Sequence, residues 1–360
     1  MGDRVPGRVL ITGGRELGGV SSFAEGLRAG FSELGIPAEI VLPSRMLSRW
    51  RELRDPRVLK ILSTTAVFAA PFARRSICMA HGVPRADAQG FLKTMGILNS
   101  YKLANLAPGA QLVAVSHYAA VTLRALFNIR IDAVVHNPVK PLYLEPNLEP
   151  DRERCYITYA GRLVAAKNLH RMIPAIRDLL DETPGLRACV IGEGPMRPLL
   201  EAMVEGDDRF EFKGAPADGQ VRAWLRRTRV FLSGNEVEGF GITYLEAMTQ
   251  GCVVVMPASG GGLEIALDKV GSSVQLLPLS WERSEVLPAL RRALGAAWTP
   301  VNTESYTAKA AACRYLRADA RFSSLGRMRR GRQQPVAQPL AEPVGEAATR
   351  LSRSAAVPSA

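Results

Sequence analysis

The feature that most constrains the fold of this chain is a regular alternation of short apolar runs with segments long enough to form helices. The runs that resemble strands in the first part of the chain are Arg8–Thr12, Ala38–Leu42, Ser76–Ala80, Gln111–Ser116 and Ile131–His136. Strands separated by helices form parallel sheets with helices on both faces. The pattern therefore predicts an α/β domain.

A second domain follows a proline-rich break. Residues 138–153 contain Pro138, Pro141, Pro146 and Pro150 and no sustained apolar period, which is typical of a linker. Strand-like runs then resume at Cys155–Tyr159, Ala188–Gly192, Phe210–Lys213, Val230–Ser233, Cys252–Met256 and Ser273–Leu277. The chain is therefore predicted to form two tandem Rossmann-like domains, each a doubly wound parallel sheet.

The predicted boundaries are residues 1–140 for the first domain, 141–153 for the linker and 154–300 for the second domain. Over residues 301–332 the alternation fades, and no helix that returns to the first domain can be recognised. Residues 333–360 are rich in Ala, Pro, Ser and Arg, a composition typical of disordered segments.

The positive charge of the chain narrows its partners. The formal net charge is +12; residues 301–360 hold ten Lys or Arg and four Asp or Glu, so they carry +6 and the rest of the chain carries the other +6. Such an excess favours anionic ligands or an anionic membrane surface. No helix-turn-helix, zinc-ligand or RNA-recognition signature accompanies it, so nucleic acid is not an expected partner.

Cysteine usage and hydropathy predict a cytoplasmic location. The five cysteines are widely scattered and none lies in a C-x-x-C pair, so buried free thiols in a reducing compartment are expected. The longest apolar run, residues 61–73, is interrupted by polar residues and Pro71 and is too short to span a membrane. The first strand leads directly into a glycine-rich turn, which is unlike a secretory signal.

The most informative stretch reads SGNEVEGFGITYLEAMTQG, from Ser233 to Gly251. It contains Glu238 and Glu246, eight residues apart. A strand is expected to end at Ser233 and a helix to begin near Ile242, which places the amides of residues 239–242 at a helix N-terminus. Free amides and the helix dipole favour an anion there. A carboxylate one turn into the helix can accept hydrogen bonds from a diol, although a solvated helix carboxylate is the simpler interpretation of Glu246.

This stretch resembles glycosyltransferase family 4, which has two glutamates at this spacing around an E-G-F-G core followed by L-E-A-M. The resemblance implies the GT-B fold, in which an acceptor domain and a nucleotide-sugar donor domain face a cleft. It also implies that Glu246 binds the ribose hydroxyls of a nucleotide and that Glu238 lies against the hydroxyls of the donor sugar. Beside them would lie the amides of Gly239, Phe240, Gly241 and Ile242.

Further stretches fall in the order that this family expects. Gly161-Arg162-Leu163 followed by Lys167 is similar to its G-R-L-x-x-x-K segment, and two fixed cations can neutralise a leaving diphosphate. Taken alone, Arg162 and Lys167 would be ordinary surface charges. Ser259-Gly260-Gly261-Gly262-Leu263-Glu264 resembles the G-G-x-x-E element that closes the nucleotide site.

The first domain matches the family more loosely. Gly18 and Gly19 resemble its glycine loop near the donor phosphates, although turn glycines explain them equally well. His81 ends a strand where the family places a histidine that faces the donor sugar; a satisfied structural histidine is the alternative. Asn137-Pro138-Val139 replaces the family's N-G-V, a departure expected to alter the turn rather than the chemistry. The remaining histidines lack metal-ligand spacing and are interpreted as structural.

The resemblance implies a retaining hexosyltransferase. The expected donor is a UDP- or GDP-sugar used as substrate, with no cofactor, and the expected acceptor is a glycan or lipid-linked saccharide. The chain has no D-x-D motif, which suits a metal-independent reaction in which Arg162, Lys167 and helix amides take the place of a metal. Glu238, His81, Arg162 and Lys167 are the predicted catalytic residues.

Three other functions remain open. A nicotinamide oxidoreductase is suggested by the glycines after the first strand, but Leu17 stands where the short-chain reductase pattern needs glycine. A nucleotide-sugar epimerase would share the fold. A non-catalytic binding protein would result if a missing C-terminal brace left the domains unable to close.

Membrane contact is a separate hypothesis. Residues 44–75 contain eight Lys or Arg and only Glu52 and Asp55 as acids, with Met46, Leu47, Trp50 and Leu53 at helical spacing. Such a basic amphipathic helix could lie on anionic lipid and meet a lipid-linked acceptor, so peripheral attachment to the inner face of a membrane is one expectation. The alternative is a surface helix packed on the sheet.

Overall fold

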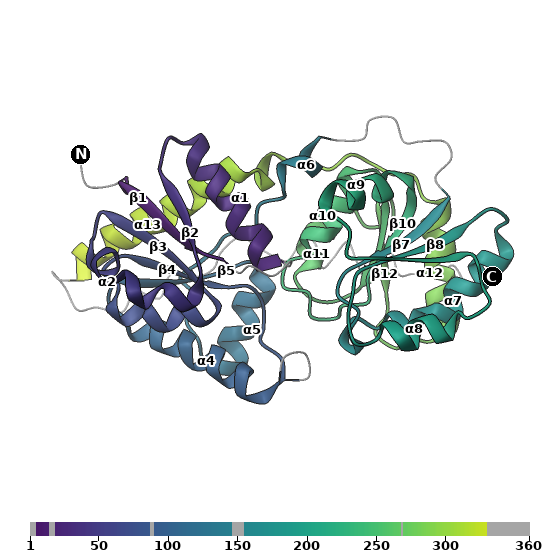
Figure 1. The fold of residues 1–360 in the computed structure, drawn as a ribbon, viewed down its shortest axis with the longest axis horizontal. Helices are drawn as coiled ribbons and strands as arrows, with labels where there is room; N and C mark the ends of the chain where they lie inside the picture. Colours follow the sequence, from purple (N-terminus) through teal and green to yellow (C-terminus); the bar gives the residue numbers. More distant parts are fainter. Residues whose placement is uncertain (1–4, 14–18, 87–89, 146–154, 268, 330–360) are drawn as a thin grey trace, which may run out of the picture. The chain divides into compact units, whose positions relative to one another are not determined.

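The computed structural model describes residues 5–13, 19–86, 90–145, 155–267 and 269–329 (Figure 1). Gly18, most of the predicted linker and the predicted tail 333–360 lie outside the described residues. The described chain contains two parallel six-stranded sheets flanked by helices, which confirms the predicted α/β fold class.

The first sheet has the strand order β2-β1-β3-β4-β5-β6. Its strands are β1 (Arg8–Thr12), β2 (Ala38–Val41), β3 (Val58–Ser63), β4 (Ser76–Ala80), β5 (Ala110–Ala114) and β6 (Ala133–Val134). Its helices are α1 (Gly19–Glu33), α2 (Trp50–Arg54), α4 (Phe91–Leu106), α5 (His117–Phe127) and α6 (Pro141–Leu144). Short 3₁₀ helices lie at η1 (Pro43–Arg45), η2 (Leu47–Arg49) and η3 (Thr64–Phe72).

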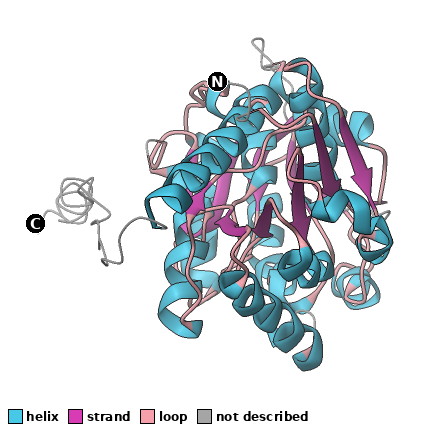
Figure 2. Ribbon diagram, turned by 90° about the vertical axis from the view of Figure 1, so that its left-hand side faces the viewer, coloured by secondary structure: helices cyan, strands magenta, loops and turns pink. Residues whose placement is uncertain are grey.

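Alternating side chains of the first sheet pack against two different layers, because successive residues of a strand point to opposite faces. Ile11 and Met79 lie in one apolar cluster with Phe23 of α1. Leu10 and Cys78 lie in another, which includes residues of α4 and η3. Figure 2 shows helices on both sides of the strands.

The second sheet has the order β12-β11-β10-β7-β8-β9. Its strands are β7 (Tyr156–Ala160), β8 (Arg187–Ile191), β9 (Phe210–Gly214), β10 (Thr228–Leu232), β11 (Val253–Pro257) and β12 (Val274–Leu277). Its helices are α7 (Leu169–Glu182), α8 (Arg197–Met203), α9 (Asp218–Arg227), α10 (Ile242–Thr249), α11 (Gly262–Ala266) and α12 (Arg283–Gly295). The 3₁₀ helices η4 (Ala165–Lys167) and η5 (Glu304–Tyr306) and the helix α13 (Ala308–Arg329) complete the described elements.

The prediction of one basic amphipathic helix within residues 44–75 is wrong. The structure has η1, η2, the five-residue α2 and then the buried strand β3 in this region. Met46 and Leu53 are buried, whereas Leu47 and Trp50 are 56% and 45% exposed. Lys60 conceals β3 in the sequence, yet it is fully buried because its Nζ donates to the carbonyls of Asp55 and Val58, both at 2.9 Å.

The first part of α13 packs against the first sheet, a contact that the sequence pattern gives no sign of. Tyr315 is buried, and its hydroxyl donates to the sulfur of Met79 in β4. The Asp319 carboxylate pairs with Arg75, and the Gln111 side chain donates to the carbonyl of Ala318 at 2.9 Å. The C-terminal brace that sequence analysis could not recognise is therefore present over residues 308–319.

Candidate active site

The loop that joins β10 to α10 carries the paired glutamates. Gly241 has φ +92°, a left-handed conformation that glycine adopts without strain, and α10 begins at the next residue. A β-carbon on Gly241 would also lie 2.5 Å from the ring of Tyr244. The predicted helix start at Ile242 is thus confirmed, and the sequence E-G-F-G has a local structural reason.

Glu238 is held as an anion at the end of this loop. Its Oε2 accepts hydrogen bonds from the Asn235 side chain at 2.6 Å and from Lys167 Nζ at 3.3 Å. Burial opposes ionisation, but the charge of Lys167 and the hydrogen bonds from Asn235, Lys167 and the Gly239 amide outweigh it. The pKa of Glu238 therefore lies below its ordinary value.

A second glutamate fixes the path of the loop without joining the site. Glu236 Oε1 accepts hydrogen bonds from Trp281 Nε1 at 2.7 Å and from Asn168 Nδ2 at 3.1 Å. Its carbonyl accepts a hydrogen bond from the Ser259 hydroxyl at 2.6 Å. The loop is therefore tied to three different segments of the second domain, so Glu238 is presented by a rigid support.

A cavity of about 330 Å³ lies in front of Glu238. It is lined by side chains of both domains: His81, Asn137, Tyr159, Ala160, Gly161, Lys167, Ser233, Glu238, Phe240, Gly241, Ile242 and Thr243. His81 and Asn137 come from the first domain, and the others come from the second. The cavity thus unites three of the four residues that sequence analysis predicts to be catalytic.

Two polar atoms at this cavity are buried without a hydrogen-bond partner among the described residues, namely His81 Nε2 and Asn137 Oδ1. The His81 ring packs edge-on against Phe23, with 4.9 Å between the ring centroids. Burial lowers the pKa of His81 to about 4, so its imidazole is neutral at physiological pH. Buried polar atoms are nearly always paired, so this arrangement is suited to hydroxyl groups of a bound molecule.

Glu246 lies one turn into α10, as predicted, but does not line the cavity. The residue is 9% exposed, and burial raises the pKa of its carboxyl to about 8. Lys140 lowers this pKa and Asp218 raises it, both by smaller amounts than burial. A carboxyl held nearly neutral in this way gains its charge only when a donor of hydrogen bonds or a cation is nearby.

The remaining predicted residues divide into two groups. Phe240, Gly241 and Ile242 line the cavity, whereas Gly239 contacts the first domain. The Arg162 side chain is exposed and is absent from the cavity lining; its carbonyl accepts a hydrogen bond from the Tyr159 hydroxyl at 3.0 Å. Gly19 begins α1, and Gly18 lies outside the described residues.

Three glycines allow the two domains to meet at the cavity. A β-carbon on Gly239 would lie 2.3 Å from the carbonyl of His81, and one on Gly261 would lie 2.1 Å from the carbonyl of Gly239. Gly82 faces the α-carbon of Gly239 at 3.3 Å by the same measure. The main chains therefore approach more closely than any side chain would permit.

Asn137 is the site residue that sequence analysis assigns to a turn only. It precedes Pro138, which restricts its backbone to extended conformations and so fixes the direction of its side chain. The available signal is its place in the chain: an amide before proline, shortly after the edge strand β6, at the carboxyl end of a parallel sheet where ligands commonly bind.

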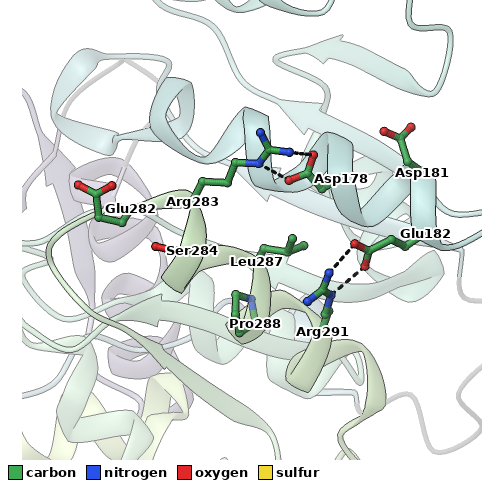
Figure 3. Close-up of a pocket in the computed structure, with 9 residues that line it drawn as sticks. All are labelled: Asp178, Asp181, Glu182, Glu282, Arg283, Ser284, Leu287, Pro288 and Arg291. Atoms are coloured by element: carbon green, nitrogen blue, oxygen red, sulfur yellow. Dashed lines mark hydrogen bonds and ion pairs between the residues drawn. The ribbon is translucent and has the colours of Figure 1, made fainter.

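A larger hollow of about 710 Å³ lies between α7 and α12 and differs in character (Figure 3). Arg283 pairs with Asp178, and Arg291 pairs with Glu182, so its charged side chains largely neutralise one another. Exposed ion pairs of this kind contribute little energy. Among the described side chains, those that line this hollow include none of the buried unpartnered atoms found at the Glu238 cavity.

The described residues bear on two further expectations. All five cysteines are free thiols, and Cys78, Cys189 and Cys252 are buried. Within the described part of the chain, no group of three His, Cys, Asp or Glu side chains has an arrangement that could hold a metal ion. No helix among the residues that the structure describes is both long and apolar enough to cross a membrane.

Comparison with known proteins relates the second domain to sugar-transferring proteins. Residues 144–275 match the family described as "Glycosyl transferases group 1". One chain of the human phosphatidylinositol N-acetylglucosaminyltransferase is 27% identical over 195 residues, which are 52% of the present chain and 38% of that protein. A GDP-mannose-dependent alpha-(1-6)-phosphatidylinositol monomannoside mannosyltransferase of Mycolicibacterium smegmatis is 33% identical over 34% of the present chain and 35% of its own. The chain thus spans little more than a third of the length of these relatives.

Solved structures relate the fold as a whole. HepE of Anabaena, in complex with UDP and glucose, has a TM-score of 0.59 at 15% identity, covering 90% of this chain and 98% of HepE. A glycosyltransferase of Rickettsia africae has a TM-score of 0.61 at 14% identity, covering 91% of this chain and 97% of its own. The fold is therefore that of the GT-B glycosyltransferases, and residues 144–275 are similar in sequence to the group 1 glycosyl transferases.

Proposed function

We propose that this protein is a retaining glycosyltransferase of family 4 that transfers a hexose-type sugar from a nucleotide-diphosphate sugar to a hydroxyl group of an acceptor. The observation that carries the proposal is the cavity that brings His81 of the first domain to Glu238 and Lys167 of the second. The mycobacterial relative is named as GDP-mannose-dependent, and HepE was solved with UDP and glucose, which supports a donor of this class.

Each residue has a role that its surroundings support. Glu238 is an anion, so it can orient the sugar hydroxyls and stabilise the positive charge that develops at the anomeric carbon. His81 is neutral and, with Asn137, can hydrogen-bond sugar hydroxyls. Lys167 lies at the cavity and can stabilise the leaving diphosphate, and we expect the exposed Arg162 to swing towards it. Glu246 binds the ribose.

The bonds change in one front-face sequence. The bond between the anomeric carbon and the diphosphate breaks, and the acceptor hydroxyl attacks the same face of the sugar. Its proton passes to the departing diphosphate, which leaves with the electron pair. Glu238 forms no covalent bond to the sugar in this route, so the anomeric configuration is retained without a glycosyl-enzyme.

Two alternatives are less well supported. A nucleotide-sugar epimerase would use the same nucleotide site, and product analysis without an acceptor distinguishes it from a transferase. The non-catalytic function depends on a missing brace, and α13 supplies contacts from Tyr315 and Asp319 to the first sheet. The acceptor is proposed to be a glycan or a lipid-linked saccharide.

We expect one nucleoside diphosphate among UDP, GDP and ADP to stabilise the protein against heat. A ligand that binds only the folded state raises the free energy of unfolding by about 2.7 kcal/mol at one hundred times its Kd. The measurement is the melting temperature with each nucleotide at saturation, repeated with a chelator, because the proposed diphosphate site uses Lys167 and Arg162 instead of a metal. No shift with any nucleotide would contradict the donor site, and a shift lost on chelation would contradict metal independence.

We also propose that the first domain contacts an anionic membrane. Leu47, Trp50, Phe68 and Phe72 are exposed, and the rings of Trp50 and Phe72 lie 5.7 Å apart. Arg54 lies over the Trp50 ring at 5.1 Å, so basic and apolar groups share this patch. Such patches bind anionic lipid through both buried apolar area and charge.

The wild type is expected to sediment with phosphatidylglycerol vesicles at low salt. A Trp50→Ser, Phe72→Ser variant should lower the bound fraction on the order of tenfold, because both rings would be lost from the lipid interface. Phosphatidylcholine vesicles serve as the uncharged control. Equal sedimentation of variant and wild type, or none by either, would remove the membrane proposal without affecting the transfer reaction.

A further inference from the structure

One carboxylate of the second domain binds the end of a helix in the first. Glu264 lies in α11, and its Oε1 accepts a hydrogen bond from the amide of Tyr118 at 2.8 Å. Its Oε2 accepts one from the amide of His117 at 3.0 Å. These are the first two amides of α5, which lack partners within their own helix.

A histidine of the first domain completes this contact. His136 Nε2 lies 3.2 Å from Glu264 Oε2. Burial opposes ionisation of Glu264, but hydrogen bonds from His136 and from the amides of Tyr118 and His117 keep the pKa of its carboxyl below the ordinary value. We refer to Glu264, His136 and the amides of His117 and Tyr118 as the Glu264 latch.

The latch leads directly to the Glu238 loop. The His136 ring stacks on Phe240, with centroids 4.8 Å apart and planes at 18°, and on Tyr306 at 6.0 Å. Phe240 lies two residues after Glu238 in the same loop. The amide of Gly261, next to α11, donates to the carbonyl of Glu238 at 2.7 Å. Both ends of the latch therefore contact the segment that presents Glu238.

The same segment meets the His81 turn through main-chain contacts. Gly239 and Gly82 lie against each other, and Gly261 lies against Ser116, the residue that caps α5. Glycines have no side chains to hold such contacts, so the contacts depend on groups nearby that fix the two domains in register. Glu264 is placed to do so because it accepts hydrogen bonds from three donors of the other domain.

We propose that Glu264 is a positioning residue of the transfer reaction, which holds the Glu238 loop of the second domain against His81 of the first. The role rests on the proposed function and extends it. Sequence analysis assigns this glutamate to the nucleotide site, whereas the structure pairs its carboxylate with the first domain. Glu264 reaches the cavity through the His136 ring, which stacks on Phe240, and through the main chain of Gly261, which bonds to Glu238.

The test compares Glu264→Ala and Glu264→Gln with Glu205→Ala, which removes an exposed carboxylate of the same domain. Hydrogen–deuterium exchange is measured for the peptide that begins α5. Glu264→Ala should raise exchange of the first amides of α5 on the order of tenfold, because they lose their acceptor. Glu264→Gln keeps one acceptor oxygen and should lie between Glu264→Ala and the wild type. Amides of β5 provide the internal reference, and unchanged β5 exchange shows that the variant is folded.

Turnover separates positioning from mere structure. In Glu264→Ala, kcat/KM for the sugar nucleotide used by the wild type should fall roughly 10²-fold, because a small displacement of reacting groups is costly. Affinity for UDP or GDP should change less than about twofold, since the latch acts on the sugar end of the site. Unchanged exchange in α5 would overturn the latch, and raised exchange with unchanged kcat/KM would overturn the positioning role. If the wild type used no sugar nucleotide, the proposed function would fail and the positioning role with it, while exchange would still decide the contact.

Discussion

Glu238→Gln is expected to lower kcat/KM for sugar transfer about 10²- to 10³-fold while leaving nucleoside diphosphate binding nearly unchanged. The substitution keeps the shape of the side chain and removes its negative charge. In the wild type that charge is held beside Lys167 and opposes the positive charge that forms on the sugar. Loss of one such group commonly costs about 3 to 4 kcal/mol of transition-state stabilisation.

The measurement is initial-rate kinetics with the sugar nucleotide that the wild type uses, chosen from UDP-glucose, UDP-N-acetylglucosamine and GDP-mannose. Glu205→Gln is the matched control, because it removes an exposed carboxylate of the same domain. A Glu238→Gln variant with full turnover would show that this carboxylate does not assist the reaction. An accumulated covalent glycosyl-enzyme would instead show that it acts as a nucleophile.

Glu246→Gln should stabilise the protein above pH 8 and weaken its nucleotide binding. The pKa of Glu246 is about 8 in the folded chain, above the ordinary value of 4.5. Folding therefore favours the protonated carboxyl, and the favourable contribution is complete below pH 4.5. It is lost as the pH rises through 8, where the buried group must ionise. Glutamine avoids this loss.

Urea unfolding at pH 5 and pH 8.5 checks the stability, and calorimetric titration with UDP or GDP checks the binding. The variant and wild type should unfold alike at pH 5, and the variant should gain about 1 to 3 kcal/mol at pH 8.5. Nucleotide affinity of the variant should drop about tenfold, since a ribose diol loses its charged acceptor. Equal unfolding midpoints at pH 8.5 would show that burial does not disfavour the charge of Glu246. Unaltered affinity would remove it from the ribose site.

Much of the architecture follows from local patterns. Arg8–Thr12 and Ser76–Ala80 are strands as predicted because their apolar runs are short and bounded by turns or helices. The loop before Ile242 can be predicted because glycine spacing, strand end and helix start all agree there. Where periodicity and turn chemistry coincide, the sequence is sufficient.

Features that depend on distant partners are not predictable in this way. β3 contains Lys60, whose burial requires carbonyls that include one from a turn five residues earlier. α13 presents alanines and Tyr315 to the sheet, a weak apolar pattern that only the complementary surface explains. The pairing of Glu264 with His136 joins residues 128 positions apart, so no local pattern could reveal it.

The brace formed by residues 308–319 makes the first domain discontinuous along the chain. During synthesis the sheet face around Met79 stays uncovered until Tyr315 has left the ribosome, long after the second domain has been made. Any exchange of first domains between relatives would have to move both segments together. A chimera cut only at the linker would pair one protein's sheet with another protein's helix, and the Arg75–Asp319 contact would become the first point of mismatch.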